Sequence, residues 1–308
     1  MDLSVDHYNG FRAVWRRASG SIVAILVLGL GLGSTAASSR SLSDFQPSSV
    51  HSVYGIVSGV SFSTGLMMLE PDALAHSPIG SMQNFSFSEP VWMIGYRSEI
   101  SDWQGQKPTG NHLCHTFSGD QMVHQDNGQV MKAIYSDAFT QGIRFPDGFG
   151  MRLEAGEELH WMPLFNNRTE FPVRVGMKCE VLLIREKDLE RELRPLQAIM
   201  RSVNMPHLFF VPPGRHQHES TFKLPFNGRI HAMGTHIHPH GQSVELFNLT
   251  RQENVWKGKK KTNDQGEMVA MEVYSNAEGY PVRSGETYRV KSVYQNPTHL
   301  KIDAMAGL

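Results

Sequence analysis

Residues 287–294 read Thr-Tyr-Arg-Val-Lys-Ser-Val-Tyr, a short run rich in β-branched and aromatic side chains. Comparable apolar runs, separated by Gly, Pro, Asn or Asp, recur at 91–96, 180–184 and 268–274. Short runs with turn residues between them are typical of β-sandwiches and jelly rolls. The pattern therefore predicts an all-β protein from about residue 52 onward.

One charged stretch interrupts this pattern. Residues 185–194 read Arg-Glu-Lys-Asp-Leu-Glu-Arg-Glu-Leu-Arg and precede Pro195, which predicts a short exposed helix or a linker. A boundary at this stretch divides the chain into an N-terminal β-sandwich domain, 52–194, and a C-terminal one, 195–308. No internal sequence repeat is apparent.

Composition excludes some classes of partner. The 308 residues carry a net charge of −1 and are 40% hydrophobic, which is typical of a globular protein without a field that attracts nucleic acid. The basic run at 257–261 precedes Thr-Asn-Asp-Gln-Gly, which predicts solvated lysines in a hairpin loop. We expect no nucleic-acid partner.

The N-terminus has the order of a secretory signal. Arginines precede the apolar run 22–32, and small residues follow it. We expect a signal peptide or an N-terminal anchor over 1–37, then a serine-rich linker over 38–51. The protein is predicted to be exported: secreted, periplasmic or N-terminally membrane-anchored. Any membrane contact would run through an uncleaved N-terminal segment.

Covalent modification is open at several positions. In an exported protein, Cys114 and Cys179 could form a disulfide, and two buried free thiols are the alternative. The triplets that begin at Asn84, Asn167 and Asn248 match the N-glycosylation acceptor pattern.

The stretch Gly234-Thr-His-Ile-His-Pro-His-Gly241 carries the strongest chemical signal. Alternate residues of a strand point to the same face, so His236, His238 and His240 would line one side of one strand. Imidazole suits copper, zinc, iron and nickel. The stretch therefore predicts a metal site.

Two segments together carry a resemblance to a known family. His238-Pro-His240-Gly and the terminal Asp303-Ala-Met305-Ala-Gly resemble the C-terminal half of the copper type II, ascorbate-dependent monooxygenases. That family includes peptidylglycine α-hydroxylating and dopamine β-monooxygenases. The resemblance implies two tandem jelly-roll-like domains and an oxygen-activating copper held by His238, His240 and Met305. It also implies hydroxylation of a C–H bond with dioxygen and a reductant such as ascorbate. The substrate, a small molecule or a peptide, is not indicated.

The family also places a copper in its first half. The matching segments here hold His112 and His115 in one predicted strand and His160 in a later one. Because residues 112 and 115 of a strand face opposite sides, the first site is predicted to be degraded or rearranged. These three histidines are weaker ligand candidates. So is His236, which could also stand behind the ligands or replace Met305.

Three alternatives stay open. The irregular first site favours a non-enzymatic extracytoplasmic copper-binding or carrier protein. His238-x-His240 followed by Glu245 matches the spacing of a cupin, which would bind iron, manganese or zinc. Its expected second motif should follow the first, yet the similar segment at 212–216 precedes it. The third alternative is an inert interaction module that has kept the fold.

Overall fold

The structure is a computed structural model, and its strands confirm the all-β class. It describes residues 50–71, 74–76, 83–102, 113–119, 131–204 and 208–308, with only the backbone described at 50–51, 74–76, 83–84, 101–102, 113–115 and 117–119. All regular elements in these ranges are strands. None of the described residues forms a helix long and apolar enough to cross a membrane. The predicted N-terminal segment 1–37 and the linker up to 49 lie outside the described residues.

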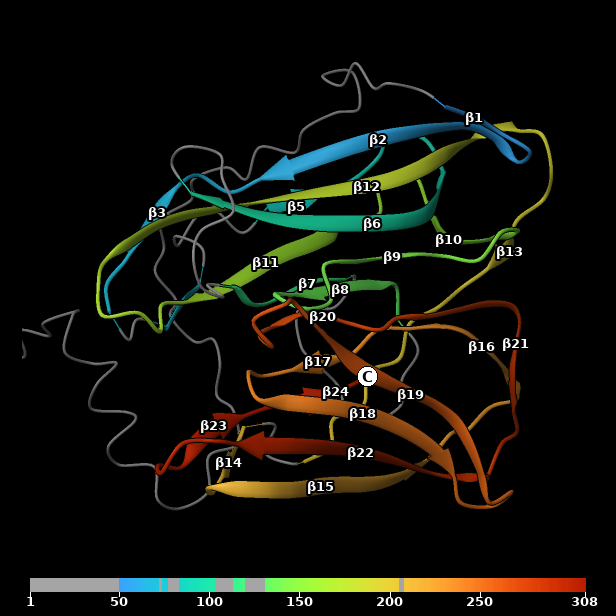
Figure 1. The fold of residues 1–308 in the computed structure, drawn as a ribbon. Coiled ribbons are helices and arrows are strands. Elements are labelled where there is room, and N and C mark those ends of the chain that lie inside the picture. Colours follow the sequence, from blue (N-terminus) through green and yellow to red (C-terminus); the bar gives the residue numbers. More distant parts are fainter. Residues whose placement is uncertain (1–49, 72–73, 77–82, 103–112, 120–130, 205–207) are drawn as a thin grey trace, which may run out of the picture. The chain divides into compact units, whose positions relative to one another are not determined.

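The first half forms two sheets. Its strands are β1 (Val50–Ser52), β2 (Gly55–Ser63), β3 (Met67–Leu69), β4 (Leu74–His76), β5 (Gln83–Phe85), β6 (Val91–Asp102), β7 (Leu113–Gly119), β8 (Ala133–Asp137), β9 (Gly142–Arg144), β10 (Phe149–Leu153), β11 (Leu159–Asn166), β12 (Val173–Leu189) and β13 (Arg194–Pro195). One sheet has the order β1-β2-β12-β6-β10-β13, with β3 on β12 and β9 on β6. The other has the order β4-β11-β7-β8, with β5 on β11, and Figure 1 shows the two as separate layers.

The second half is built around one larger sheet. Its strands are β14 (Phe209–Val211), β15 (Gly214–Lys223), β16 (Gly228–Met233), β17 (His236–Ile237), β18 (Gly241–Asn248), β19 (Glu253–Thr262), β20 (Met268–Met271), β21 (Tyr274–Val282), β22 (Thr287–Asn296), β23 (Ile302–Ala304) and β24 (Ala306–Gly307). The order β15-β22-β18-β19-β20 makes the main sheet, and β14–β23, β16–β21 and β17–β24 form three strand pairs.

The charged stretch 185–194 is the clearest error of the sequence analysis. Its first half continues strand β12 to Leu189, where Arg185 pairs with Val91 and Leu189 with Gly55. The remainder is irregular up to β13. A helix of ten residues is marginal by itself, so two neighbouring strands that offer complete hydrogen-bonded ladders outweigh its helical preference.

One buried cluster runs through both halves. It contains Trp161 and Val181 from the first half and Val290 and Tyr294 from the second, all fully buried.

Residues 37–308 form one compact unit. Within the described ranges no sheet combines strands from both sides of residue 195, so the predicted boundary coincides with a change of sheet. The division into two domains stays a prediction.

A buried asparagine anchors the loop after β11. Asn167 donates through Nδ2 to the carbonyls of Leu69 (3.0 Å) and Phe171 (2.7 Å). Its Oδ1 accepts from the amide (3.0 Å) and the hydroxyl (2.7 Å) of Thr169. Phe171 at the tip of this loop is 72% exposed.

The loop after β22 repeats this arrangement. Asn296 donates to the carbonyls of Val211 (3.0 Å) and Leu300 (2.7 Å). Its Oδ1 accepts from the amide (2.9 Å) and the hydroxyl (2.8 Å) of Thr298. Leu300 is 63% exposed, as Phe171 is in the first loop. An internal repeat of the form Asn-x-Thr-x-apolar therefore exists, although the sequence analysis found none.

Two glycosylation triplets are structural. Asn167 is 1% exposed and Asn248 is fully buried, and both side chains are bonded within the protein. A glycan needs an accessible Nδ2, so the folded chain could not carry one at either position. Asn84 has no described side chain.

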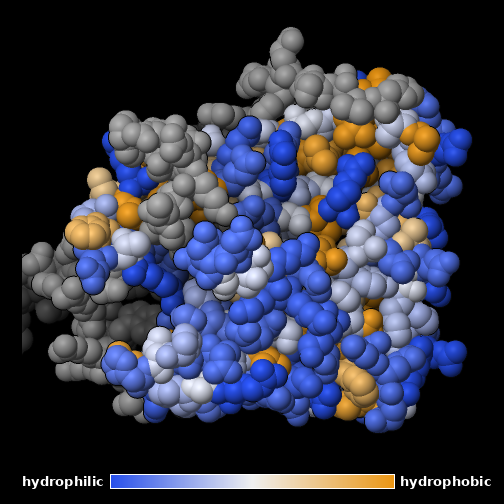
Figure 2. Space-filling model, viewed as in Figure 1, coloured by the Kyte–Doolittle hydropathy of each residue, from blue (hydrophilic) through white to orange (hydrophobic). Residues whose placement is uncertain are grey.

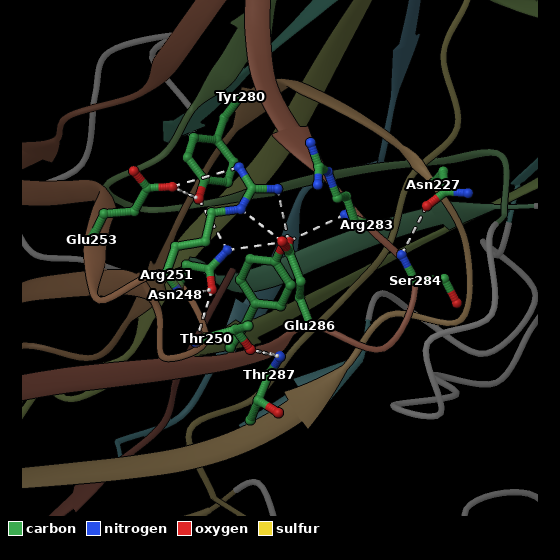
Figure 3. A network of polar contacts seen from close by, with 11 residues as sticks. Asn227, Asn248, Thr250, Arg251, Glu253, Tyr280, Arg283, Ser284, Glu286 and Thr287 are labelled. Atoms are coloured by element: carbon green, nitrogen blue, oxygen red, sulfur yellow. Dashed lines mark hydrogen bonds and ion pairs between the residues drawn. The ribbon is translucent and has the colours of Figure 1, made fainter.

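Asn248 belongs to a polar network at one end of the second half (Figure 3). Its centre is Glu286, whose carboxylate accepts from Arg251 Nε (2.6 Å) and Nη2 (3.0 Å) and from the hydroxyl of Tyr288 (2.7 Å). Asn248 Nδ2 adds a fourth contact at 3.2 Å. Burial acts to raise the pKa of Glu286, but these donors lower the pKa to about 2.

Candidate metal centre

Two of the predicted histidines form a buried pair. His236 begins the short strand β17 and is 8% exposed, while His238 follows the strand and is 6% exposed. Their ring centroids lie 5.2 Å apart, with the ring planes at 86°. Ile237 between them packs into the core, as the alternation of a strand requires.

His240 does not continue this face. The strand ends at Ile237, and the chain turns, with the amide of Gly241 donating to the carbonyl of His238 (3.2 Å). His240 sits in the turn with φ of 70° and an exposed side chain. Pro239, which cannot donate to a ladder, stands where the strand would have continued. The expectation of three imidazoles on one strand face is wrong.

A carboxylate from the first half holds His236. The Nδ1 of His236 donates to Oδ2 of Asp137 at 2.7 Å. The other oxygen of Asp137 accepts from the amides of Phe139 (2.8 Å) and Thr140 (2.5 Å), so a turn fixes the carboxylate. The hydroxyl of Thr140 in turn donates to the carbonyl of Thr235 at 2.6 Å. Burial raises the pKa of Asp137 to about 7, against the two amide donors that lower it.

A second carboxylate holds His238. Its Nδ1 donates to Oδ2 of Asp303 at 3.0 Å. The carboxylate of Asp303 also accepts hydrogen bonds from Arg168, from Nη1 to Oδ1 at 2.9 Å and from Nη2 to Oδ2 at 2.6 Å. The bond from His238 and then the guanidinium hold the pKa of Asp303 well below its usual range. Although its side chain is exposed, the ring of His240 is partly desolvated by its surroundings; this, followed by the positive charges of Arg168 and Lys260, lowers its pKa.

Met305 lies opposite His238, between strands β23 and β24. Ile237 pairs with Ala306, and one residue further the amide of His238 donates to the carbonyl of Met305 (3.1 Å). Directly opposite residues of an antiparallel pair point to the same face. The hydroxyl of Tyr294 donates to the same carbonyl at 2.7 Å and accepts from the amide of His238 at 3.2 Å.

A cavity of about 860 Å³ adjoins this centre. His236 and Met305 both line it, together with residues from each half of the chain. A volume of this size lies in the upper part of the range of roughly 300–1,000 Å³ that small-molecule sites occupy.

The strand register does not bring His115 and His160, two of the candidates for a first copper site, together. His112 lies outside the described residues, and only the backbone of His115 is described. His115 pairs with Leu164 on β11 and with Asp137 on β8. His160 stands four residues before Leu164 on the same strand, a separation of about 13 Å. A first site made by His115 and His160 is therefore not supported, whereas His115 neighbours the aspartate that holds His236.

Three other described histidines have different surroundings. His231 stacks on Phe149 with ring centroids 4.0 Å apart and bonds through Nδ1 to the carbonyl of Asn276 at 3.1 Å. His218 stacks on Phe209 in the same way, at 4.1 Å. His299 is exposed in the loop after β22.

Cys179 is a free, buried thiol. Burial raises the pKa of this thiol to about 11. The side chain of Cys114 is not described, and the structure contains no disulfide at Cys179. The alternative of a buried free thiol thus holds for this cysteine.

The cupin ligand Glu245 is engaged elsewhere. Its carboxylate lies 3.0 Å from Lys291 Nζ, 3.6 Å from Arg289 and 3.8 Å from Lys257. The face over β18 and β19, which carry Glu245 and Lys257, is hydrophilic in Figure 2. Three cations around one carboxylate explain Glu245 without a metal.

Sequence reasoning missed the carboxylate partners. Asp137 lies in the first half, 99 residues before its partner His236. Arg168, also in the first half, lies 135 residues before its partner Asp303. A possible local signal was the turn that Asp137 makes with Phe139 and Thr140. In the part of the chain that the structure describes, no three His, Cys, Asp or Glu side chains form a group that could hold a metal.

Comparison with known proteins adds little. No protein-family model matches the chain, and no curated protein matches it significantly. A solved structure, that of the coconut allergen cocosin, is 10% identical over 85% of this chain and 83% of its own. Its TM-score of 0.13 is too low to carry an argument about fold or function.

Proposed function

We propose that this chain holds a copper ion through His236, His238 and Met305 and acts as a copper-dependent monooxygenase. The observation that carries the proposal is the buried imidazole pair, in which each Nδ1 donates to its own carboxylate. This pairing is common behind metal-binding imidazoles, because it fixes the tautomer in which Nε2 is the ligand.

The donor set fits copper. Two neutral imidazoles and a thioether make a soft set that suits Cu(I), whereas zinc and iron sites more often include carboxylate or thiolate ligands. The site proposed here differs from the sequence-based one in a single residue, His236 in place of His240. The buried position of His236 beside His238, and the exposed turn that holds His240, support the exchange.

A bound copper would supply one-electron chemistry and a position for dioxygen. The protein residues orient that position: Asp137 and Asp303 hold the rings, and His236 and Met305 line the neighbouring cavity. The net reaction inserts one oxygen atom of dioxygen into a C–H bond and reduces the other to water. Two electrons from a reductant such as ascorbate and two protons from solvent balance it.

The wider expectations belong to the same proposal. The repeated loops at Asn167 and Asn296 support two halves of related, jelly-roll-like architecture. Export of the chain accords with a copper centre that meets an extracellular reductant. A non-enzymatic copper carrier is the second candidate. His115 on β7 pairs with Leu164, four residues from His160 on β11, which argues against a second copper made by these two histidines. The reaction needs two electrons and a lone copper stores one, so a single copper favours the carrier.

Copper content in single variants tests the ligand set. We expect one copper per wild-type chain after anaerobic loading, with loss of that copper in His236→Ala and in His238→Ala. His240→Ala is the matched control and should keep it. Loss in His240→Ala with retention in His236→Ala would overturn the exchange, and retention in all three would overturn the site. Reductant-dependent oxygen uptake by the loaded protein separates the enzyme from the carrier.

A further inference from the structure

Several polar side chains in the wall of the cavity beside His236 are bonded within the protein. Tyr96 lines the cavity, but its hydroxyl donates to the carbonyl of Tyr135 at 2.6 Å. Tyr288 also lines it, and its hydroxyl donates to Glu286 at 2.7 Å. Neither hydroxyl proton is available to a ligand without breaking a bond in the protein.

Two nitrogen-bearing side chains of the wall are engaged in the same way. His231 bonds through Nδ1 to the carbonyl of Asn276 at 3.1 Å. Arg229 donates through Nε and Nη2 to the carbonyls of residues 278 and 279 in β21. Each interaction is with a backbone carbonyl of a neighbouring element, so these groups brace the wall.

Arg201 is a further cation in the wall of the cavity. Its guanidinium lies over the ring of Phe222, 4.8 Å from the centroid, and both residues line the cavity. The ring of Phe222 therefore covers one side of this guanidinium. Much of the rest of the wall is apolar, including Ile143, Phe149 and Leu246.

We infer that this cavity binds an uncharged, mainly hydrocarbon molecule with a long chain or fused rings. A ligand with many polar groups would lose its hydration without finding partners, whereas an apolar ligand of this size gains from burial. His236 and Met305 lie in the wall, so such a ligand would present C–H bonds to the candidate metal centre. The inference that the cavity binds such a ligand stands independently of the proposed function. Only the inference that this ligand is also the substrate rests on the proposed function.

Binding of N-phenyl-1-naphthylamine, an uncharged apolar fluorophore, tests the inference on the full chain. The protein is treated with chelator first, so copper binding cannot affect the result. Ala198→Phe and Ala232→Phe add a ring in the wall, and Ala155→Phe is the matched control in an exposed turn. We expect saturable binding that weakens by about tenfold or more in the two wall variants, because each ring displaces several ligand carbons, and not in the control.

Displacement of the fluorophore by competing ligands tests whether the cavity prefers an uncharged molecule. We expect 1-dodecanol to displace the fluorophore at least about tenfold better than dodecanoate of the same chain length, because an ionised head loses hydration at the wall. Absence of binding, or equal binding by wild type and both wall variants with intact thermal unfolding, overturns the cavity assignment. Preference for dodecanoate that disappears in Arg201→Gln overturns the uncharged ligand class. Fluorophore binding by a chain that takes no copper would refute the proposed function alone.

Discussion

Replacing Asp137 by Asn changes one atom of the candidate metal centre. The Oδ1 atom can keep both amide donors, Phe139 at 2.8 Å and Thr140 at 2.5 Å. The atom that faces Nδ1 of His236 at 2.7 Å becomes an amide nitrogen, which donates rather than accepts. The imidazole must then carry its proton on Nε2, the atom that we assign to the metal.

The size of this effect follows from the geometry. Removing the partner behind a metal-binding imidazole costs about 10–100-fold in metal affinity, or roughly 1.4–2.8 kcal/mol. The fold itself should change little, because burial already brings the pKa of Asp137 to about 7 and an amide resembles its protonated form. We expect the free energy of unfolding of the metal-free variant to stay within about 1 kcal/mol of the wild type.

Competition with a Cu(I) chelator of known affinity, under anaerobic conditions, measures the loss. Urea unfolding of the metal-free protein measures stability alongside it. Asp147→Asn, at an exposed turn of the same half, is the control and should match the wild type in both. Copper affinity of Asp137→Asn within twofold of the wild type would refute the role given to Asp137. A loss matched by global unfolding would refute the isosteric argument.

Three further outcomes are expected. Asn167→Ala and Asn296→Ala should each lower the free energy of unfolding by roughly 2–3 kcal/mol, because each leaves several buried groups without their hydrogen-bond partner. If urea titrations give the two variants losses that differ by more than the contribution of one hydrogen bond, the two asparagines do not have equivalent roles. The pKa of Glu286 falls on folding from 4.5 to about 2, so its contribution is complete above pH 4.5 and is lost as pH falls toward 2. Stability measured from pH 6 to 3 should therefore drop more steeply in the wild type than in Glu286→Gln, and parallel curves would count against the network. Cys179 should resist a thiol reagent in the folded protein and react in denaturant without prior reduction, and a persistent lack of reaction would indicate a disulfide.

The all-β class could be predicted because its signal is local. Runs such as 287–294 carry the composition of strands within themselves, and the structure forms strand β22 there. The stretch 185–194 misled because its helical spacing is also local, while the strands that capture its first half come from far along the chain. Local preference decides only where no distant partner competes.

The site was predictable only in part for the same reason. Alternation along a strand joins His236 to His238, but it fails at His240 because a turn intervenes. Asp137 could not be linked to His236 from sequence, since that link depends on how the loop after β8 meets the second half. The loop at Asn167 was visible as a glycosylation triplet, but the burial of Asn167 reveals its structural role.

X-ray absorption at the copper edge tests the central claim most directly. Anaerobically loaded Cu(I) protein should show imidazole nitrogens and one sulfur scatterer, and the sulfur should be absent in Met305→Ile while the nitrogens remain. A wild-type spectrum without sulfur, or a sulfur signal that persists in Met305→Ile, would contradict a copper centre formed by His236, His238 and Met305.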